Sequence, residues 1–414
     1  MLGLKRAPGR DASLPRSDRL RSLFFLETGS GWRVPELDGL RAIAALMVLF
    51  GHSYKYSDRP SIPIVTPLLQ SGGRGGVLLF FALSGFLLYL PWVRGEEEGT
   101  GPPSLRTYAL RRCLRIMPAY YVCVVALFLI RRIQRGFWSD PVDLGLHLVF
   151  LPLFGHAFLS VFWTLQVEEF FYWSLPGLHR LFRRGRERAG LAITAVVTLG
   201  YGLLVVAFAN DPRWQGVLLL ETPFFLVAFG LGMTSAVWWV RRRSSPDAWK
   251  LVLGGAVGYL VLAQISSYAV DHHASNVTEI WLRLAFAPFA SMIVLGVARG
   301  GLRQLAVLPL RIVGAISYSL YLWHEFLIRS VSLPGGRAPG LLTRLVLDGA
   351  MATAVAMASF LVVERPFLLL RPRLRPRREP TGQGPVTHSA VPEPPPSPVV
   401  GGALDDVPEV SPSV

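Results

Sequence analysis

The sequence predicts an all-α polytopic membrane protein with about ten transmembrane helices around a central cavity. Hydrophobic residues make up 51% of the 414 residues, charged residues only 17%, and the mean hydropathy is +0.41. Soluble domains carry about 25% charged residues. Apolar runs of about 20 residues, the length that crosses a bilayer, recur along the chain. A single soluble core could not bury so many long apolar segments.

Three regions follow one another along the chain. Residues 1–35 are basic with few apolar runs, which predicts a cytoplasmic tail and no cleavable signal peptide. Residues 36–366 hold the predicted transmembrane domain. Residues 367–414 are first basic and then rich in Pro, Ser and Gly. Such a composition cannot bury apolar surface, so we expect a disordered cytoplasmic tail.

The predicted spans share an apolar composition and are separated by polar or basic loops. They lie near residues 37–57, 76–93, 116–134, 163–182, 190–209, 216–240, 249–269, 280–298, 311–330 and 341–363. Between the third and fourth spans, residues 135–160 are apolar but interrupted by Pro152 and Gly155. This interruption predicts a half-span or an interfacial helix.

Basic residues set the predicted orientation. Arg is frequent in alternate loops, near residues 94–115, 180–188, 241–250 and 299–311. The positive-inside rule therefore places both termini in the cytoplasm. Two groups of cations fall on the predicted outer side instead: Lys55, Arg59 and Arg74, and Arg131, Arg132 and Arg135. Such exceptions indicate either a charged site or misplaced span boundaries.

Charge and cysteine content exclude other classes of protein. The net charge is +15 and the isoelectric point about 10.4, a basic balance that often indicates nucleic-acid binding. Here the charge sits in short runs between apolar segments, so no nucleic-acid partner is expected. Cys113 and Cys123 are the only cysteines in the sequence, too few for a disulfide framework or a zinc cluster. No metal site is predicted.

The first predicted span, within ELDGLRAIAALMVLFGHS, contains two ionisable residues, Arg41 and His52. Such residues are costly in a bilayer and normally face a cavity or one another. They are 11 residues apart, about three helical turns, and so share one face at depths that differ by roughly 16 Å. We expect them to line one cavity, where Arg41 could hold an anion and a neutral His52 could accept a proton. A snorkelling Arg and a structural His are the alternatives.

Further polar residues interrupt later apolar segments. Glu168 and Tyr172 are i, i+4 neighbours in FWTLQVEEFFYW. Ser317, Tyr321 and His324 share one helix face in SYSLYLWHEF.

Two other stretches contain polar residues that have both a functional and a purely structural interpretation. Arg112 and Arg115 lie at a cytoplasmic membrane edge, where they could bind a ligand or only lipid phosphate. Ser84, in FFALSGFLL, lacks the surroundings of a nucleophile elbow, so its segment more simply predicts a small-residue helix contact.

Five motifs, in one order over residues 40–325, resemble the membrane-bound acyltransferase-3 family. That family carries an Arg, then ten residues, then a His in its first span, and an FF-x-LSGFL segment, matched here by Arg41, His52 and FFALSGFLL. It also has R-x-x-R-I-x-P-x-Y, W-[ST]-L-x-x-E-x-x-x-Y and SY-x-x-YL-x-H motifs, matched at residues 112–120, 163–172 and 317–324. Each motif is short, but the ordered set is specific.

The resemblance implies an O-acyltransferase of the bacterial cytoplasmic membrane. Its donor would be acyl-CoA, usually acetyl-CoA, used as a co-substrate without any permanently bound cofactor. Its acceptor would be a hydroxyl of a carbohydrate, glycolipid or macrolide. The oligomeric state is not indicated.

The resemblance also assigns roles to individual residues. His52 would be the catalytic base and Arg41 its essential partner, with Glu168 beside them. Arg112 and Arg115 would contact the CoA phosphates. The residues expected to line the substrate site are Tyr172, Tyr321 and His324.

One departure from the family and two other functions stay open. Relatives often have an Asp in the position of Leu78, so another group must orient His52 here if that Asp does so elsewhere. A secondary transporter or flippase would also need buried Arg, Glu and His, but no inverted repeat is apparent. A non-catalytic scaffold would not need so many buried ionisable groups.

Overall fold

The computed structural model describes residues 16–25, 33–135, 141–150, 161–208, 222–273, 276–330 and 339–370. Within these ranges all regular structure is helical, so the all-α prediction is confirmed. Residues 371–414 of the predicted C-terminal tail, most of residues 1–35, and residues 151–160 lie outside the described residues.

The described helices follow the predicted spans closely. The long helices are α2 (Pro35–Lys55), α3 (Val65–Glu97), α4 (Leu105–Arg135), α6 (Phe162–Leu181), α7 (Glu187–Phe208), α9 (Thr222–Arg241), α10 (Ala248–Asp271), α11 (Asn276–Ala298) and α14 (Leu341–Ser359). The shorter elements are α1 (Arg16–Phe24), α5 (Pro141–Leu148), η1 (Arg303–Ala306), α12 (Leu308–Ala315), α13 (Ser317–Ser330), η2 (Phe360–Glu364) and α15 (Arg365–Leu368). The ninth predicted span is divided between α12 and α13.

Seven of the described helices are long and apolar enough to cross a membrane. They are α3, α4, α7, α9, α10, α11 and the continuous segment Leu341–Leu368. The remaining predicted spans coincide with α2, α6 and the α12–α13 pair, each of which carries ionisable residues of the candidate site. The ionisable residues make α2 and α6 less apolar than the other long helices, and α12 and α13 are each too short to cross a bilayer alone. The number of ten spans therefore stays a prediction.

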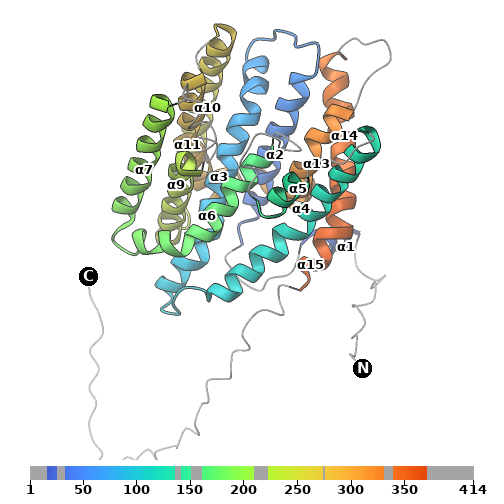
Figure 1. The fold of residues 1–414 in the computed structure, drawn as a ribbon. Coiled ribbons are helices and arrows are strands. Elements are labelled where there is room, and N and C mark those ends of the chain that lie inside the picture. Colours follow the sequence, from blue (N-terminus) through green and yellow to red (C-terminus); the bar gives the residue numbers. More distant parts are fainter. Residues whose placement is uncertain are drawn as a thin grey trace, which may run out of the picture. The chain divides into compact units, whose positions relative to one another are not determined.

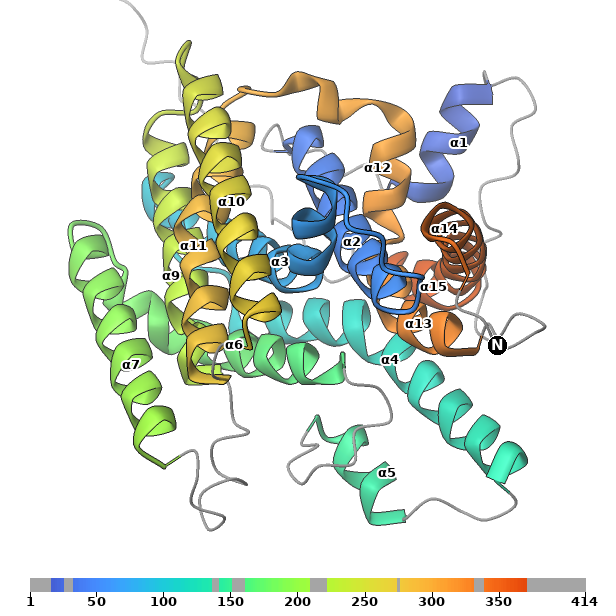
Figure 2. The same cartoon turned by 90° about the horizontal axis from the view of Figure 1, so that it is seen from above.

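Helices α2 and α3 lie at the middle of the described helices (Figures 1 and 2). On one side, α3 packs against α9, α10 and α11, with α7 beyond α9. On the other side, α2 packs against α12, α13 and α14. Helices α4 and α6 run along a third side, where α6 contacts α3 and α4 contacts α13 and η2. Segments far apart in the sequence therefore meet around α2 and α3.

Glycines on α3 allow its backbone to approach that of α2. A Cβ atom on Gly72 would lie 2.6 Å from the carbonyl oxygen of Met47, and one on Gly76 would lie 2.7 Å from that of Ala44. The spacing of four residues is the small-residue pattern of close helix pairs in membranes. The sequence predicted that this span begins near residue 76, whereas α3 begins at Val65. The glycines before residue 76 do not end the helix, because they allow it to pack closely against α2.

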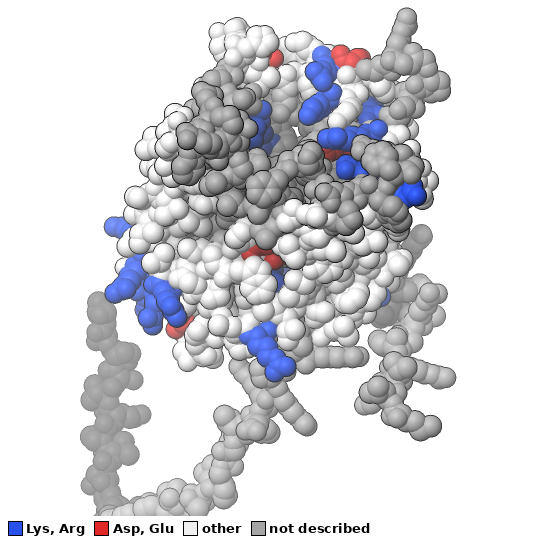
Figure 3. Space-filling view, in the orientation of Figure 1, with Lys and Arg blue, Asp and Glu red and all other residues white. Residues whose placement is uncertain are grey.

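The helix ends beside the Arg-rich loops lie together at one end of the bundle. Glu97 of α3 pairs with Arg184 after α6 at 3.8 Å, and Glu187 of α7 pairs with Arg241 of α9. Arg299, after α11, donates hydrogen bonds to carbonyls at the end of α9. Figure 3 shows a largely uncharged middle on one face, with Lys and Arg towards its two ends. This distribution fits an apolar band facing lipid.

Candidate functional site

A first cavity, which we call the Arg41 cavity, has a volume of about 370 Å³ and is bounded mainly by α2, α3, α4, α6 and α13. Its charged lining residues are Arg33, Asp38, Arg41, Arg112, Arg115 and Glu168. Four arginines thus face two carboxylates, and the lining is positive overall. Tyr172 and Tyr321 line the same cavity, so six of the eight predicted site residues come together here.

The arginines of this cavity differ in their partners. Arg115 pairs with the buried carboxylate of Glu364 at 3.6 Å. The guanidinium of Arg112 lies over the Tyr172 ring, 5.9 Å from its centroid. Arg41 forms no hydrogen bond or close ion pair with a described residue. Arginine binds carboxylate and phosphate groups through several donors at once, so this group of side chains can hold an anionic ligand.

Glu168 faces the same cavity from α6. Its carboxylate accepts a hydrogen bond from the Ser84 hydroxyl of α3 at 2.5 Å. Sequence reasoning gave Ser84 no role beyond a helix contact. The neighbouring Gly85 does make such a contact, because a Cβ there would lie 2.3 Å from the Phe229 carbonyl oxygen of α9. Ser84 itself connects α3 to the acidic residue of the site.

A second cavity, the His52 cavity, has a volume of about 440 Å³. It lies beside the last turn of α2 and the first half of α3, with residues of α6, α9, α10, α11 and α13 completing its wall. His52 lines this cavity and not the first one. The expectation that Arg41 and His52 line one cavity is therefore wrong, although both lie on α2 as predicted.

Hydrogen bonding fixes the tautomer of His52. Its Nδ1 atom lies 2.8 Å from the Val48 carbonyl oxygen, one turn earlier in α2. A carbonyl oxygen only accepts, so Nδ1 must carry the proton, and Nε2 keeps its lone pair. A Cβ on Gly73 would lie 3.6 Å from the Cε1 atom of His52, so α3 packs close to the ring. In the neutral ring, Nε2 is therefore the nitrogen that can accept a proton.

His324 of α13 lies directly against His52. The two ring centroids are 5.0 Å apart in an edge-to-face arrangement, and His324 is also 5.4 Å from the Tyr321 ring. The Nδ1 atom of His324 lies 2.7 Å from the Tyr321 carbonyl oxygen, and its buried Nε2 has no hydrogen-bond partner. The face of α13 predicted from Ser317, Tyr321 and His324 therefore runs from the Arg41 cavity to His52.

Three residues separate the two cavities. Val77, Thr164 and Tyr321 line both, and we call them the partition. The Thr164 hydroxyl and the Tyr321 hydroxyl are 2.6 Å apart, and both lie near the Val161 carbonyl oxygen, at 2.9 and 3.1 Å. These hydrogen bonds join α6 to α13, and Val77 adds an apolar contact surface from α3. Sequence reasoning missed Thr164 and Val77, because nothing in their own segments marks them.

Leu78, at the position where the family resemblance led us to expect an Asp, lines the His52 cavity and is almost fully buried. No carboxylate is therefore supplied to His52 from that position. The Val48 carbonyl makes the contact with Nδ1 instead. Among the described residues, no group of three or more His, Cys, Asp or Glu could hold a metal ion.

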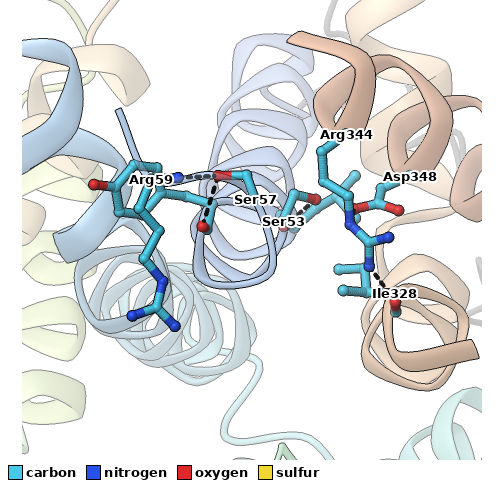
Figure 4. Close-up of polar contacts among 8 residues, drawn as sticks. Ser53, Ser57, Arg59, Ile328, Arg344 and Asp348 are labelled. Atoms are coloured by element: carbon cyan, nitrogen blue, oxygen red, sulfur yellow. Dashed lines mark hydrogen bonds and ion pairs between the residues drawn. The ribbon is translucent and has the colours of Figure 1, made fainter. Parts of the chain in front are cut away.

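A buried ion pair lies behind the end of α2, on the side away from Arg59 (Figure 4). Within α14, the Nε atom of Arg344 lies 2.9 Å from the Oδ2 atom of Asp348. Arg344 also donates a hydrogen bond to the Ile328 carbonyl of α13. Ser53, the residue after His52, lies beside Asp348. This pair connects α13 and α14 at the level of His52.

Comparison with known proteins gives one family. A family model described as an acyltransferase domain matches residues 34–363. Nodulation protein 10 of Rhizobium leguminosarum is 25% identical over 381 residues, covering 85% of this chain and 98% of the relative. Exopolysaccharide production protein ExoZ of Rhizobium meliloti is 28% identical over 326 residues, covering 73% of this chain and 92% of the relative.

A longer relative is matched over about half of its own length. Peptidoglycan O-acetyltransferase OatA of Listeria monocytogenes is 25% identical over 369 residues, covering 80% of this chain and 55% of the relative. No solved structure matches the chain significantly.

Proposed function

Because the chain belongs to the acyltransferase-3 family, we propose that this membrane O-acyltransferase moves an acetyl group from acetyl-CoA to a hydroxyl of a carbohydrate or related acceptor. The observation that carries the proposal is the pair of adjoining cavities. One is lined by arginines, and the other contains a histidine whose Nε2 lone pair is available. A donor that carries phosphates needs the arginine-lined environment. An acceptor hydroxyl that must lose a proton needs the environment that contains the histidine.

We propose that the donor occupies the Arg41 cavity. The phosphates of CoA would meet Arg112 and Arg115, and the pantetheine arm would extend past Arg41 towards the partition. Arg115 is already held by Glu364, which fixes its guanidinium before a ligand arrives. Because the cavity is partly desolvated, its charge–charge interactions are stronger than they would be in water.

In the proposed reaction, His52 is the general base. Its Nε2 atom takes the proton of the acceptor hydroxyl, and the oxygen attacks the thioester carbon. A carbon–oxygen bond forms and the carbon–sulfur bond breaks. The departing CoA thiolate then takes the proton from the imidazolium. Glu168 and Tyr172 face the donor, while Tyr321 and His324 complete the wall near the acceptor.

The relatives support a saccharide acceptor, since their names refer to exopolysaccharide production and peptidoglycan O-acetylation. We place the protein in the bacterial cytoplasmic membrane with residues 36–366 as its membrane domain. The gathering of basic loops at one end of the bundle supports a cytoplasmic location for both termini, including the tails 1–35 and 367–414.

The experiment measures acetyl transfer from labelled acetyl-CoA to a glycan-rich envelope extract by the purified protein in detergent. We expect transfer by the wild type and its loss in His52→Ala, because the variant lacks the imidazole that we propose as the base. Arg112→Gln should raise the KM for acetyl-CoA about tenfold with a smaller effect on kcat, as expected for a lost contact of about 1.4 kcal/mol to a bound phosphate.

Lys250→Gln is the matched control, since Lys250 is exposed at the start of α10, where it pairs with Asp247 and lies over the Trp249 ring, far from both cavities. It should transfer acetyl groups as the wild type does. Near-normal transfer by a folded His52→Ala variant would exclude His52 as the base. Movement of an intact solute across vesicles without any acetylated product would instead support a transporter.

A further inference from the structure

Residues 16–25, which we call the N-terminal segment, contribute two side chains to the Arg41 cavity. Phe24 and Phe25 both line this cavity. They lie outside residues 34–363, the part of the chain that the acyltransferase family model matches. The cavity that we assign to the donor is therefore completed by aromatic side chains from outside the family domain.

Two contacts attach the N-terminal segment to the last helices of the chain. The Phe24 ring stacks on the Phe360 ring of η2, with the ring centroids 5.7 Å apart. The Nε atom of Arg365 in α15 donates a hydrogen bond to the Leu23 carbonyl oxygen at 2.9 Å. Figure 1 shows α1 beside α15 at one end of the bundle. Because α1 has only nine residues, it depends on such packing for its stability.

The Phe25 ring is held by groups from α12 and from the start of α2. The guanidinium carbon of Arg311 lies 4.3 Å from the centroid of this ring, and that of Arg33 lies 5.0 Å from it. Both guanidinium groups also pair with the Asp38 carboxylate, at 3.6 and 3.2 Å. Phe25 is buried by these contacts. A side chain that is already fixed loses little conformational entropy when a ligand packs against it.

Positions along α2 give the order of groups in the cavity. Asp38, Arg41 and Ala44 follow one another in steps of about 4.5 Å along the helix axis. Asp38 contacts the cations over Phe25, whereas Ala44 packs against Gly76, the residue before the partition's Val77. A donor that passes Arg41 with its thioester at the partition would therefore have its opposite end near Phe25.

The end of CoA opposite to the thioester is an adenosine group. Aromatic side chains bind bases by stacking, and the planar guanidinium group of Arg also packs on flat rings. Phe24 and Phe25 supply aromatic rings at this end of the cavity, and Arg33 lines it beside them. The side chains here thus suit a base, whereas Arg112 and Arg115 suit the phosphates that precede it.

We propose that Phe24 and Phe25 form the subsite for the adenine base of the donor, so that a segment outside the family domain contributes to the affinity for CoA. This inference rests on the proposed function, because it takes CoA to be the ligand of the Arg41 cavity. Arg112 and Arg115 keep their proposed contacts with the phosphates, and the thioester stays at the partition.

The test measures binding in the absence of any acyl group or acceptor. Purified full-length protein in detergent is titrated calorimetrically with CoA or with 4′-phosphopantetheine, which keeps the arm and one phosphate but lacks the adenosine. Phe25→Leu keeps an apolar side chain and removes the aromatic ring. We expect it to weaken CoA binding about tenfold, as for a lost contact between a base and an aromatic ring, and to leave 4′-phosphopantetheine binding unchanged.

Further variants assign the effect to the ring. Phe25→Tyr keeps the ring and should bind CoA as the wild type does. Phe367→Leu is the matched control, because Phe367 in α15 is exposed and is not among the described residues that line the Arg41 cavity. Thermal unfolding without ligand shows whether each variant folds. Phe24→Leu, which removes the other ring, should weaken CoA binding selectively as well and decides the matter if Phe25→Leu does not fold.

The outcomes separate this proposal from the proposed function. Equal weakening of both ligands by Phe25→Leu, or unchanged CoA binding, would overturn the adenine subsite and leave the proposed function standing. Absence of CoA binding by the wild type would overturn both. Ring-dependent CoA binding without any acetyl transfer would support the subsite and count against the proposed chemistry only.

Discussion

The buried pair of Arg344 and Asp348 provides the sharpest test of how the end of α2 is held. Their side chains are 2% and 0% exposed, and they lie in a helix that is otherwise largely apolar. Replacing Asp348 with Leu would remove the carboxylate that lies 2.9 Å from this buried guanidinium. Arginine cannot lose its charge in a protein, so the structure must either bury that charge or open locally to hydrate it.

The expected size of the effect follows from the geometry. At 2.9 Å, two unit charges attract by about 6 kcal/mol if the effective dielectric constant is about 20. Desolvation offsets much of this attraction, yet removing one partner of a buried pair still costs about 3–5 kcal/mol. For a protein of this size, that loss corresponds to a fall in the unfolding midpoint of roughly 3–6 °C.

The assay compares thermal unfolding of the wild type, Asp348→Leu, Arg344→Met and the double variant in one detergent. Asp348→Leu should be the least stable, because a lone Asp can take up a proton whereas a lone Arg cannot release one. The double variant should be more stable than Asp348→Leu, since no unpaired charge remains. Lys250→Gln, which breaks an exposed pair of similar length, 2.8 Å, should leave the midpoint unchanged.

The result that would refute this reasoning is additivity. If the double variant loses as much stability as both single variants together, the two side chains are not energetically coupled. The pair would then have no part in holding α13 and α14 behind His52.

Two further predictions concern α3 and the partition. Gly76→Val should lower the midpoint of thermal unfolding, because its Cβ would lie 2.7 Å from the Ala44 carbonyl oxygen of α2. A midpoint equal to that of the wild type would contradict the close approach of the two helices. Tyr321→Phe should fold normally but lower kcat for acetyl transfer about tenfold, because it removes the 2.6 Å hydrogen bond to Thr164. An unchanged kcat would show that the Tyr321 hydroxyl has no role in turnover.

Much of the fold could be predicted from the sequence, because apolar length and Arg placement reflect the bilayer directly. The predicted spans at residues 249–269 and 280–298 correspond closely to α10 and α11. The start of α3 could not be predicted in the same way. Gly72, Arg74 and Gly76 weaken the apolar signal of their segment, and only the packing against α2 makes a helix there favourable.

The candidate site was predicted where the signal lies within one segment. Arg41, Glu168 and Tyr172 interrupt apolar runs, and the structure brings them to one cavity. The division of that space into two cavities could not be predicted, because it depends on Thr164 and Tyr321, which are 157 residues apart in the chain. A hydroxyl in an apolar helix is common, and only its partner across the bundle reveals what it does.

The partition has a consequence for how the two co-substrates of the proposed reaction would meet. Because Val77, Thr164 and Tyr321 line both cavities, the donor and the acceptor would each occupy a cavity of its own and approach one another only at this boundary. The acyl group alone would pass from one cavity to the other, so the thioester in the first would drive the modification of a hydroxyl in the second.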